Sequence, residues 1–121
     1  MVKIIVIEDN KQNMYLFVFL LEKHGFEVLQ AINGETGIKM VLNSNPDLIL
    51  LDWQLPDISG LEVTKRIKSF DKVKSTPIIF CTSNVMPGDK EKAFEAGATA
   101  YIEKPINPEL FMYEIKSYIE E

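Results

Sequence analysis

The chain has 121 residues, 46% of them hydrophobic and 26% charged, and a formal net charge of −5. This length and composition predict one globular domain, residues 1–121, with a substantial core. The negative charge would repel a polyanionic backbone, which argues against direct binding of nucleic acid. The longest apolar run, Met14 to Leu21, is too short to cross a bilayer, and no signal-peptide pattern precedes it. A single cysteine, Cys81, is expected to be buried, and together these features predict a cytoplasmic protein without a membrane partner.

Short apolar segments of strand length alternate with stretches of helical spacing. The predicted strands are Lys3 to Ile7, Phe26 to Ile32, Leu48 to Leu51, Pro77 to Cys81 and Ala100 to Ile102. The predicted helices cover residues 11–24, 35–43, 60–70, 87–96 and 108–120. Continuously apolar strands are typical of a sheet that helices cover on both faces. The alternation therefore predicts an α/β domain with a parallel sheet.

Several residues at the predicted helix ends have the chemistry of caps. Ser59 and Asn107 precede helices and have side-chain oxygens that can accept the first free N–H groups. Gly25 and Gly97 stand where helices end, and glycine readily adopts the conformation required there. These positions predict the helix boundaries independently of hydrophobic spacing.

Polar residues follow four of the predicted strands. They are Glu8 and Asp9, Asp52, Thr82 and Lys104. Ligands of an open parallel sheet bind beyond the carboxyl ends of its strands, so these side chains are expected to converge. Three carboxylates would repel one another unless a cation joined them, and an all-oxygen donor set favours Mg²⁺. Such a site can present a phosphoryl group to a carboxylate, with a lysine to balance charge and a hydroxyl to donate a hydrogen bond.

These residues lie in four ordered segments, which read IEDN, LLDWQLPDISG, CTSN and YIEKPI. With this spacing, and over essentially its whole length, the chain resembles the receiver domain of two-component response regulators. Within that family it looks most like the stand-alone cell-division and chemotaxis-type regulators. The resemblance implies a flavodoxin-like, doubly wound sheet of five parallel strands in the order 2-1-3-4-5, flanked by five helices.

The resemblance implies that the site takes up a phosphoryl group with the help of Mg²⁺. Asp52 would be the residue that is phosphorylated. Asp9 would bind the metal directly, Glu8 would contact it through water, and the carbonyl of Trp53 would be a further ligand.

Further roles follow from the same resemblance. Lys104 would pair with the phosphoryl group, Thr82 would be the switch hydroxyl, and Tyr101 would be the switch aromatic residue that turns inward. Asp52, Lys104 and Thr82 would together carry the catalysis. A cis peptide before Pro105 is also implied, since X-Pro bonds adopt cis at low cost.

The resemblance implies a signalling module rather than a dedicated enzyme. A histidine kinase or a histidine phosphotransfer protein would donate the phosphoryl group, and the domain would catalyse both its transfer and its slow hydrolysis. Phosphorylation would switch the binding of a downstream protein. The domain would be a monomer or a dimer that forms on phosphorylation.

The first predicted helix has an unusually apolar outer face. The residues expected to face the sheet are Met14, Leu16, Phe17, Leu20 and Leu21. Tyr15, Val18 and Phe19 lie on the opposite arc, and an exposed apolar patch usually marks a partner surface. In receivers this helix is where the helical bundle of the phosphodonor docks, so these three residues are the predicted partner surface.

Other functions fit parts of the pattern. A haloacid-dehalogenase-like phosphohydrolase carries a second acid two residues after its nucleophile, where this chain has Gln54. A degenerate receiver would not need the acids, threonine and lysine that this chain retains. A flavodoxin-like electron carrier would need a Ser/Thr/Gly-rich phosphate loop after the first strand. His24, in a last helical turn, is explained by the helix dipole rather than as a phosphohistidine.

Overall fold

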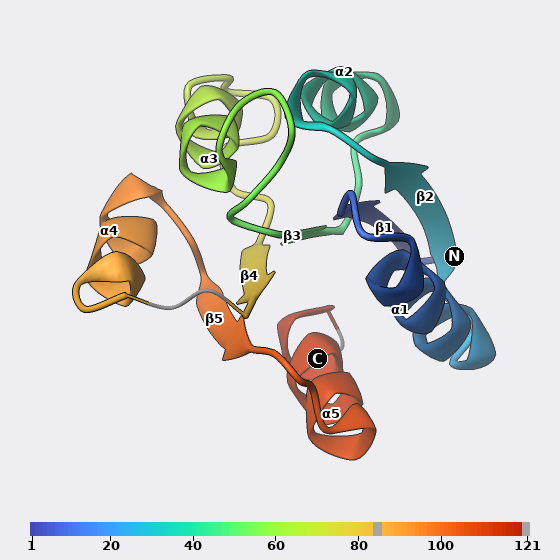
Figure 1. Ribbon diagram of the computed structural model, residues 1–121. Helices are drawn as coiled ribbons and strands as arrows, with labels where there is room; N and C mark the ends of the chain where they lie inside the picture. Colours follow the sequence, from blue (N-terminus) through green and yellow to red (C-terminus); the bar gives the residue numbers. More distant parts are fainter. Residues whose placement is uncertain (84–85, 120–121) are drawn as a thin grey trace.

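The computed structural model describes residues 1–83 and 86–119. One parallel sheet has the strand order β2-β1-β3-β4-β5, which confirms the predicted architecture and order (Figure 1). The strands are β1 (Lys3–Ile7), β2 (Glu27–Ala31), β3 (Leu48–Leu51), β4 (Ile78–Thr82) and β5 (Ala100–Glu103). The helices are α1 (Lys11–Lys23), α2 (Gly34–Ser44), α3 (Gly60–Lys68), α4 (Asp89–Ala96) and α5 (Pro108–Ile119).

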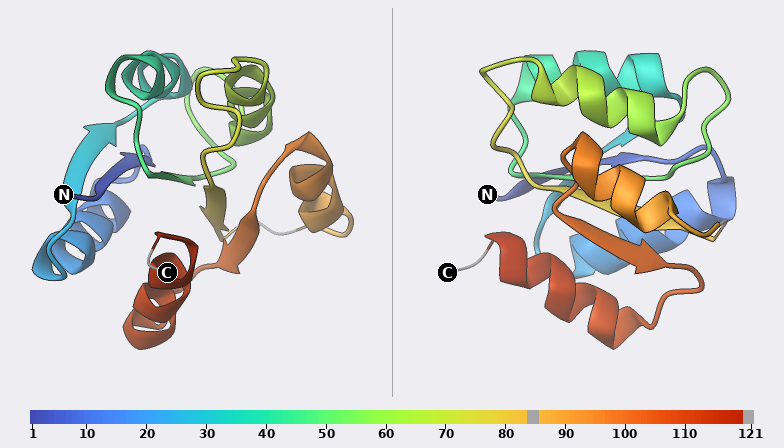
Figure 2. Two further views of the ribbon diagram at one scale, coloured as in Figure 1. Left: turned by 180° about the vertical axis from the view of Figure 1, so that it is seen from behind. Right: turned by 90° about the vertical axis from the view of Figure 1, so that its left-hand side faces the viewer.

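Two helical layers enclose the sheet, with α1 and α5 on one face and α2 and α3 on the other (Figure 2). Successive residues of a strand point to opposite faces, so each strand supplies both layers. In β1, Ile4 and Val6 belong to the core under α1 and α5, whereas Ile5 and Ile7 belong to the core under α2, α3 and α4. All four are fully buried, which explains why the strand is continuously apolar.

The predicted caps are present. Ser59 Oγ accepts the N–H of Glu62 at 3.1 Å at the start of α3, and Asn107 Oδ1 accepts the N–H groups of Glu109 and Leu110 before α5. Gly97 ends α4 with a φ of 120°, a conformation that favours glycine. The peptide before Pro105 is cis, as expected.

Some element ends differ from the prediction by one or two residues. β4 begins at Ile78 rather than at Pro77, because proline has no N–H to donate to a sheet. β4 also extends to Thr82, whose carbonyl accepts the N–H of Lys104 at 3.0 Å. α4 begins at Asp89, after Gly88 with its positive φ of 87°.

The orientation of α1 corrects two predictions. Leu16, expected to face the sheet, is 37% exposed, and Val18, expected outside, packs half-buried against the core. One residue turns a helix by about 100°. The inward direction lies between Phe17 and Leu21, which leaves Leu16 on the outer side and brings Val18 next to Met14.

Within the described residues, no helix is long and apolar enough to span a membrane.

The packing of α5 predicts a measurable difference between two of its residues. Ile115 is fully buried, so Ile115→Ala should lower the free energy of unfolding by about 3 kcal/mol through lost burial and a residual cavity. Tyr113 is 76% exposed on the same helix, and Tyr113→Ala should change it by less than about 0.5 kcal/mol. Urea denaturation monitored by circular dichroism measures both. Equal losses in the two variants would contradict this packing of α5.

Candidate functional site

The predicted polar residues meet at the carboxyl end of the sheet. Glu8 and Asp9 follow β1, Asp52 follows β3, Thr82 ends β4 and Lys104 follows β5. A cavity of about 270 Å³ opens there. Its lining residues are Glu8, Asp9, Asn10, Asn13, Asp52, Gln54, Leu55, Pro56, Ser83 and Lys104.

The strand register brings two of the acids together. Ile7 of β1 pairs with Leu51 of β3, so the residues that follow them, Glu8 and Asp52, lie side by side. The N–H of Asp52 donates to the carbonyl of Ile7 at 3.1 Å, which continues the ladder past the strand ends. Both side chains are held by backbone that cannot shift without breaking the sheet.

Glu8, Asp9 and Asp52 form an acidic cluster. One carboxylate oxygen from each lies within 4.8 Å of the other two. Glu8 and Asp52 are 1% and 9% exposed, whereas Asp9 lies on the open side. Oxygen donors at this spacing are the set that a hard divalent cation prefers, so the cluster fits Mg²⁺.

Lys104 bridges the two buried carboxylates. Its Nζ lies 2.7 Å from Glu8 Oε1 and 3.1 Å from Asp52 Oδ2, and its side chain is 9% exposed. Burial alone would lower the pKa of Lys104, but the hydrogen bond to Glu8 and the charge of Asp52 outweigh it and raise the pKa. Burial raises the pKa of Glu8, and the hydrogen bond from Lys104 only partly offsets this. The lysine therefore stays charged and holds the acids together.

The Trp53 carbonyl, a predicted metal ligand, already accepts one hydrogen bond. The N–H of Gly60 donates to it at 2.7 Å, which directs it toward the start of α3, and Trp53 does not line the cavity. The next residue, Gln54, does line it. Gly60 is required at this turn because a Cβ there would collide with the carbonyl oxygen of Asp52. The indole of Trp53 instead packs against Phe80, with 5.6 Å between ring centroids.

Thr82 and Tyr101 lie beside the cavity rather than in its wall. Thr82 is 1% exposed, and its neighbour Ser83 is the residue that lines the cavity. The half-buried ring of Tyr101 packs against Phe80, with 6.1 Å between centroids. Its hydroxyl is buried, with no hydrogen-bond partner among the described residues, and burial raises the pKa of Tyr101.

Cys81 is buried as expected, and burial raises its pKa to about 12, so the thiol stays neutral.

Two asparagines of the cavity were absent from the predicted site. Asn10 Oδ1 accepts the N–H of Asn13 at 2.9 Å and so caps α1. The N–H of Asn10 donates to Glu8 Oε2 at 3.2 Å, so Glu8 uses one oxygen for this turn and the other for Lys104. An asparagine directly before a helical pattern is an N-cap signal, which could have identified Asn10.

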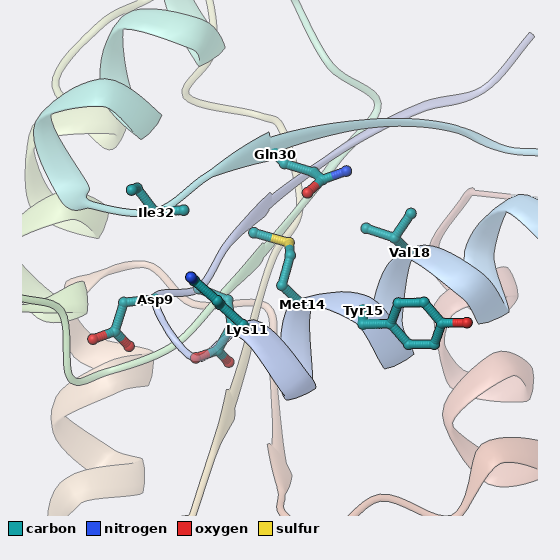
Figure 3. A pocket seen from close by; sticks show the side chains of 8 residues that line it. Asp9, Lys11, Met14, Tyr15, Val18, Gln30 and Ile32 are labelled. Atoms are coloured by element: carbon teal, nitrogen blue, oxygen red, sulfur yellow. The ribbon is translucent and has the colours of Figure 1, made fainter.

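A second cavity, of about 310 Å³, lies between α1 and the edge of β2 (Figure 3). Asp9 and Lys11 lie toward one end, and Tyr15 and Val18 toward the other. Tyr15 is 73% exposed and Phe19 52%, and their rings stack with 6.4 Å between centroids. Tyr15 of the predicted partner surface therefore lines the same cavity as Asp9 of the acidic cluster.

The ion pairs of Lys104 predict a strong effect of removing its charge. Lys104→Met should lower the stability of the metal-free protein at neutral pH by about 3 kcal/mol, because two carboxylates stay buried without their cation. Because the pKa of Lys104 is raised in the folded state, the wild-type advantage should be complete below pH 10.5 and should disappear as the pH rises through the folded-state value. Urea denaturation across this pH range measures the difference.

Lys39 provides the matched control, because its side chain is exposed on α2. Lys39→Met should change the stability by less than about 0.5 kcal/mol at every pH. Similar losses in the two variants would show that the ion pairs of Lys104 contribute no specific stability.

Comparisons with known proteins agree with this geometry. The sequence model of the response regulator receiver domain matches residues 4–116. The polar-differentiation response regulator DivK of Brucella anthropi is 43% identical over 116 residues, 96% of this chain and 94% of DivK. The chemotaxis protein CheY4 of Vibrio cholerae matches with a TM-score of 0.92 at 26% identity, over 98% of both chains. The receiver domain of the sensor histidine kinase PA1611 from Pseudomonas aeruginosa PAO1, solved with a magnesium ion in its active site cleft, matches with a TM-score of 0.91 at 27% identity, over 98% of both chains. The chain thus belongs to the response regulator receiver domain family.

Proposed function

We propose that Asp52 accepts the phosphoryl group in this receiver domain, with Mg²⁺ bound at the acidic cluster. The observation that carries this proposal is the meeting of three carboxylates within 4.8 Å with the amine of Lys104 on Asp52. Asp52 lies at the centre of this arrangement, since it belongs to the acidic cluster, pairs with the lysine and lines the cavity. Gln54, where a haloacid-dehalogenase-like phosphohydrolase has its second acid, disfavours that alternative.

The proposed metal shell uses the residues that line the cavity. Asp9 and Asp52 would bind Mg²⁺ directly, and Glu8, already bonded to Lys104 and Asn10, would contact it through water. Gln54 replaces Trp53 as the source of a further oxygen, because the Trp53 carbonyl is bonded to Gly60. When bound, Mg²⁺ supplies neutralising charge and orients phosphoryl oxygens.

The protein's own residues prepare the transfer. Asp52 attacks phosphorus, a P–O bond forms, and the bond from phosphorus to the donor's imidazole nitrogen breaks. Lys104 holds Asp52 Oδ2 at 3.1 Å and so fixes the orientation of the nucleophile. The acquired phosphoryl group adds about −1.5 to −2 charges, which Lys104 is placed to balance. Water entering the same cavity would hydrolyse the aspartyl phosphate slowly.

Thr82 and Tyr101 are proposed to convert phosphorylation into a change of surface. Thr82 ends β4 beside the cavity, and a new phosphoryl group would attract its hydroxyl. Phe80 and Tyr101 are paired in register on adjacent strands, so a displacement of β4 near Thr82 would also displace Tyr101. The buried hydroxyl of Tyr101 has no partner among the described residues, so moving the ring would break no hydrogen bond of this hydroxyl there.

A histidine kinase or a histidine phosphotransfer protein is the proposed donor, with docking on α1. Tyr15 and Phe19 form the exposed part of this surface, Val18 lines its inner wall, and Leu16 extends it. Tyr15 and Val18 line one cavity with Asp9, so a donor bound here would lie close enough to present its phosphohistidine to the acidic cluster. A cytoplasmic location is proposed with this donor and target.

Trp53 provides a test of the acceptor site because it directly follows Asp52 in the chain. Its fluorescence should change saturably with Mg²⁺ and again when acetyl phosphate is added, since metal and phosphoryl group each alter the local field. Mass spectrometry should show the addition of one phosphoryl group. Asp52→Asn should lose both the second change and the added mass. A wild-type protein that responds to neither reagent would instead be a degenerate receiver that only binds partners.

The docking surface predicts a donor-dependent defect. The double variant Tyr15→Ser, Phe19→Ser should accept phosphoryl groups from phosphorylated histidine phosphotransfer domains about tenfold more slowly, because exposed aromatic anchors contribute much of a binding energy. Its reaction with acetyl phosphate should be unchanged. Phe70→Ser is the control, since Phe70 is 41% exposed just beyond α3, on the other side of the sheet. Normal transfer in the double variant would exclude this docking surface.

A further inference from the structure

The loop between β3 and α3 is bonded to the start of α2 through Asp57. Oδ1 of Asp57 accepts the N–H of Gly34, and Oδ2 accepts the N–H of Glu35, both at 2.8 Å. These N–H groups belong to the first turn of α2, where no helical carbonyl is available to them. The helix already has a local cap, since Asn33 Oδ1 accepts the N–H of Thr36 at 2.8 Å. Asp57 is therefore a second cap, from a segment more than twenty residues away.

The loop that carries Asp57 also packs closely against the start of α2. A Cβ on Gly34 would lie 2.5 Å from Ile58 Cγ1 and 2.8 Å from Val63 Cγ2, so the first turn of α2 touches the loop and α3 directly. Burial acts to raise the pKa of Asp57, but the N–H groups of Glu35 and Gly34 outweigh it and lower the pKa. The carboxylate is thus ionised, and its charge also complements the positive end of the helix dipole.

The loop held in this way is the wall of the phosphoacceptor cavity. Gln54, Leu55 and Pro56 line the cavity and directly precede Asp57. One end of the loop is fixed by the N–H of Gly60, which donates to the Trp53 carbonyl at 2.7 Å. Between these residues the chain has no helix or strand. Leu55 and Ile58 pack against the core, and the N–H of Gln54 donates to Asp52 Oδ1 at 3.4 Å, so the bonds from Asp57 to α2 add a further restraint on this segment.

We propose that Asp57 is a positioning residue for the phosphoacceptor site, which fixes the wall from Gln54 to Pro56 by capping α2. The inference rests on the proposed function of this site. Asp57 does not line the cavity and is bonded to α2, so its effect on Mg²⁺ passes through the loop. A wall free to move would hold the oxygen ligand near Gln54 less well and would weaken metal binding.

Asp57→Ala tests this proposal, with Asp57→Asn as the conservative variant. Amide hydrogen exchange of the metal-free proteins measures how readily the loop opens. Titration with Mg²⁺, followed by Trp53 fluorescence, measures the dissociation constant of the site for the metal. In Asp57→Ala, exchange at Gly34, at Glu35 and across residues 53–58 should rise about fivefold, as expected when a helix cap is lost. The dissociation constant for Mg²⁺ should rise severalfold. Asp57→Asn, which keeps one acceptor oxygen, should lie between this variant and the wild type.

Arg66→Met is the matched control. Arg66 of α3 pairs with Glu35 of α2 at 3.0 Å and with Glu62 of its own helix at 3.1 Å, and neither partner belongs to the loop. It should leave loop exchange and Mg²⁺ affinity at wild-type values. Unchanged loop exchange in Asp57→Ala, or the same change in Arg66→Met, would overturn the proposal. A wild-type protein that does not bind Mg²⁺ would refute the proposed function, while the exchange measurement would still decide whether Asp57 holds the loop.

Discussion

The pairing of β1 with β3 is the constraint on which the site depends. Because Ile7 and Leu51 are partners in a parallel register, Glu8 and Asp52 must emerge side by side. Two buried carboxylates in this position repel each other, and the sheet gives them no freedom to separate. Lys104, delivered by β5 from the far edge of the sheet, is the compensating charge. Without Lys104, both buried carboxylates would lack the cation that pairs with them.

The same constraint prepares the site for a second cation. Lys104 occupies one oxygen of Asp52, and Asn10 and Lys104 occupy both oxygens of Glu8. Asp9, on the open side, is the member of the acidic cluster that solvent reaches most easily. One lysine cannot neutralise three acids, so the cluster keeps a net negative charge that attracts a divalent ion. The single positive charge of Lys104 thus stabilises the folded sheet, but phosphoryl transfer requires more positive charge than this lysine supplies.

The sequence predicted the chemistry of the site better than its geometry. Acids and a lysine after apolar strands converge in any parallel sheet, so their meeting follows from the pattern. The wheel of α1 gave the angular spread of its apolar residues but not the direction of the sheet, so Leu16 and Val18 were misplaced. The hydrogen bond from Gly60 to the Trp53 carbonyl could not be predicted, because a backbone oxygen is directed by loop hydrogen bonds, which residue types do not encode. The contact of Asp57 with α2 joins distant segments and left no signal in the local sequence.

An aromatic row connects the acceptor loop with the outer strand. Trp53 packs against Phe80 and Phe80 against Tyr101, with centroid distances of 5.6 Å and 6.1 Å. Close-packed rings transmit a displacement because they have no free volume in which to absorb it. The loop at one end of this row is held by Gly60 and by Asp57, whereas the hydroxyl at the other end has no partner among the described residues. If phosphorylation of Asp52 displaces this row, as proposed, movement of the loop away from α2 and α3 would break these bonds, whereas movement of the Tyr101 hydroxyl would break none within the described residues.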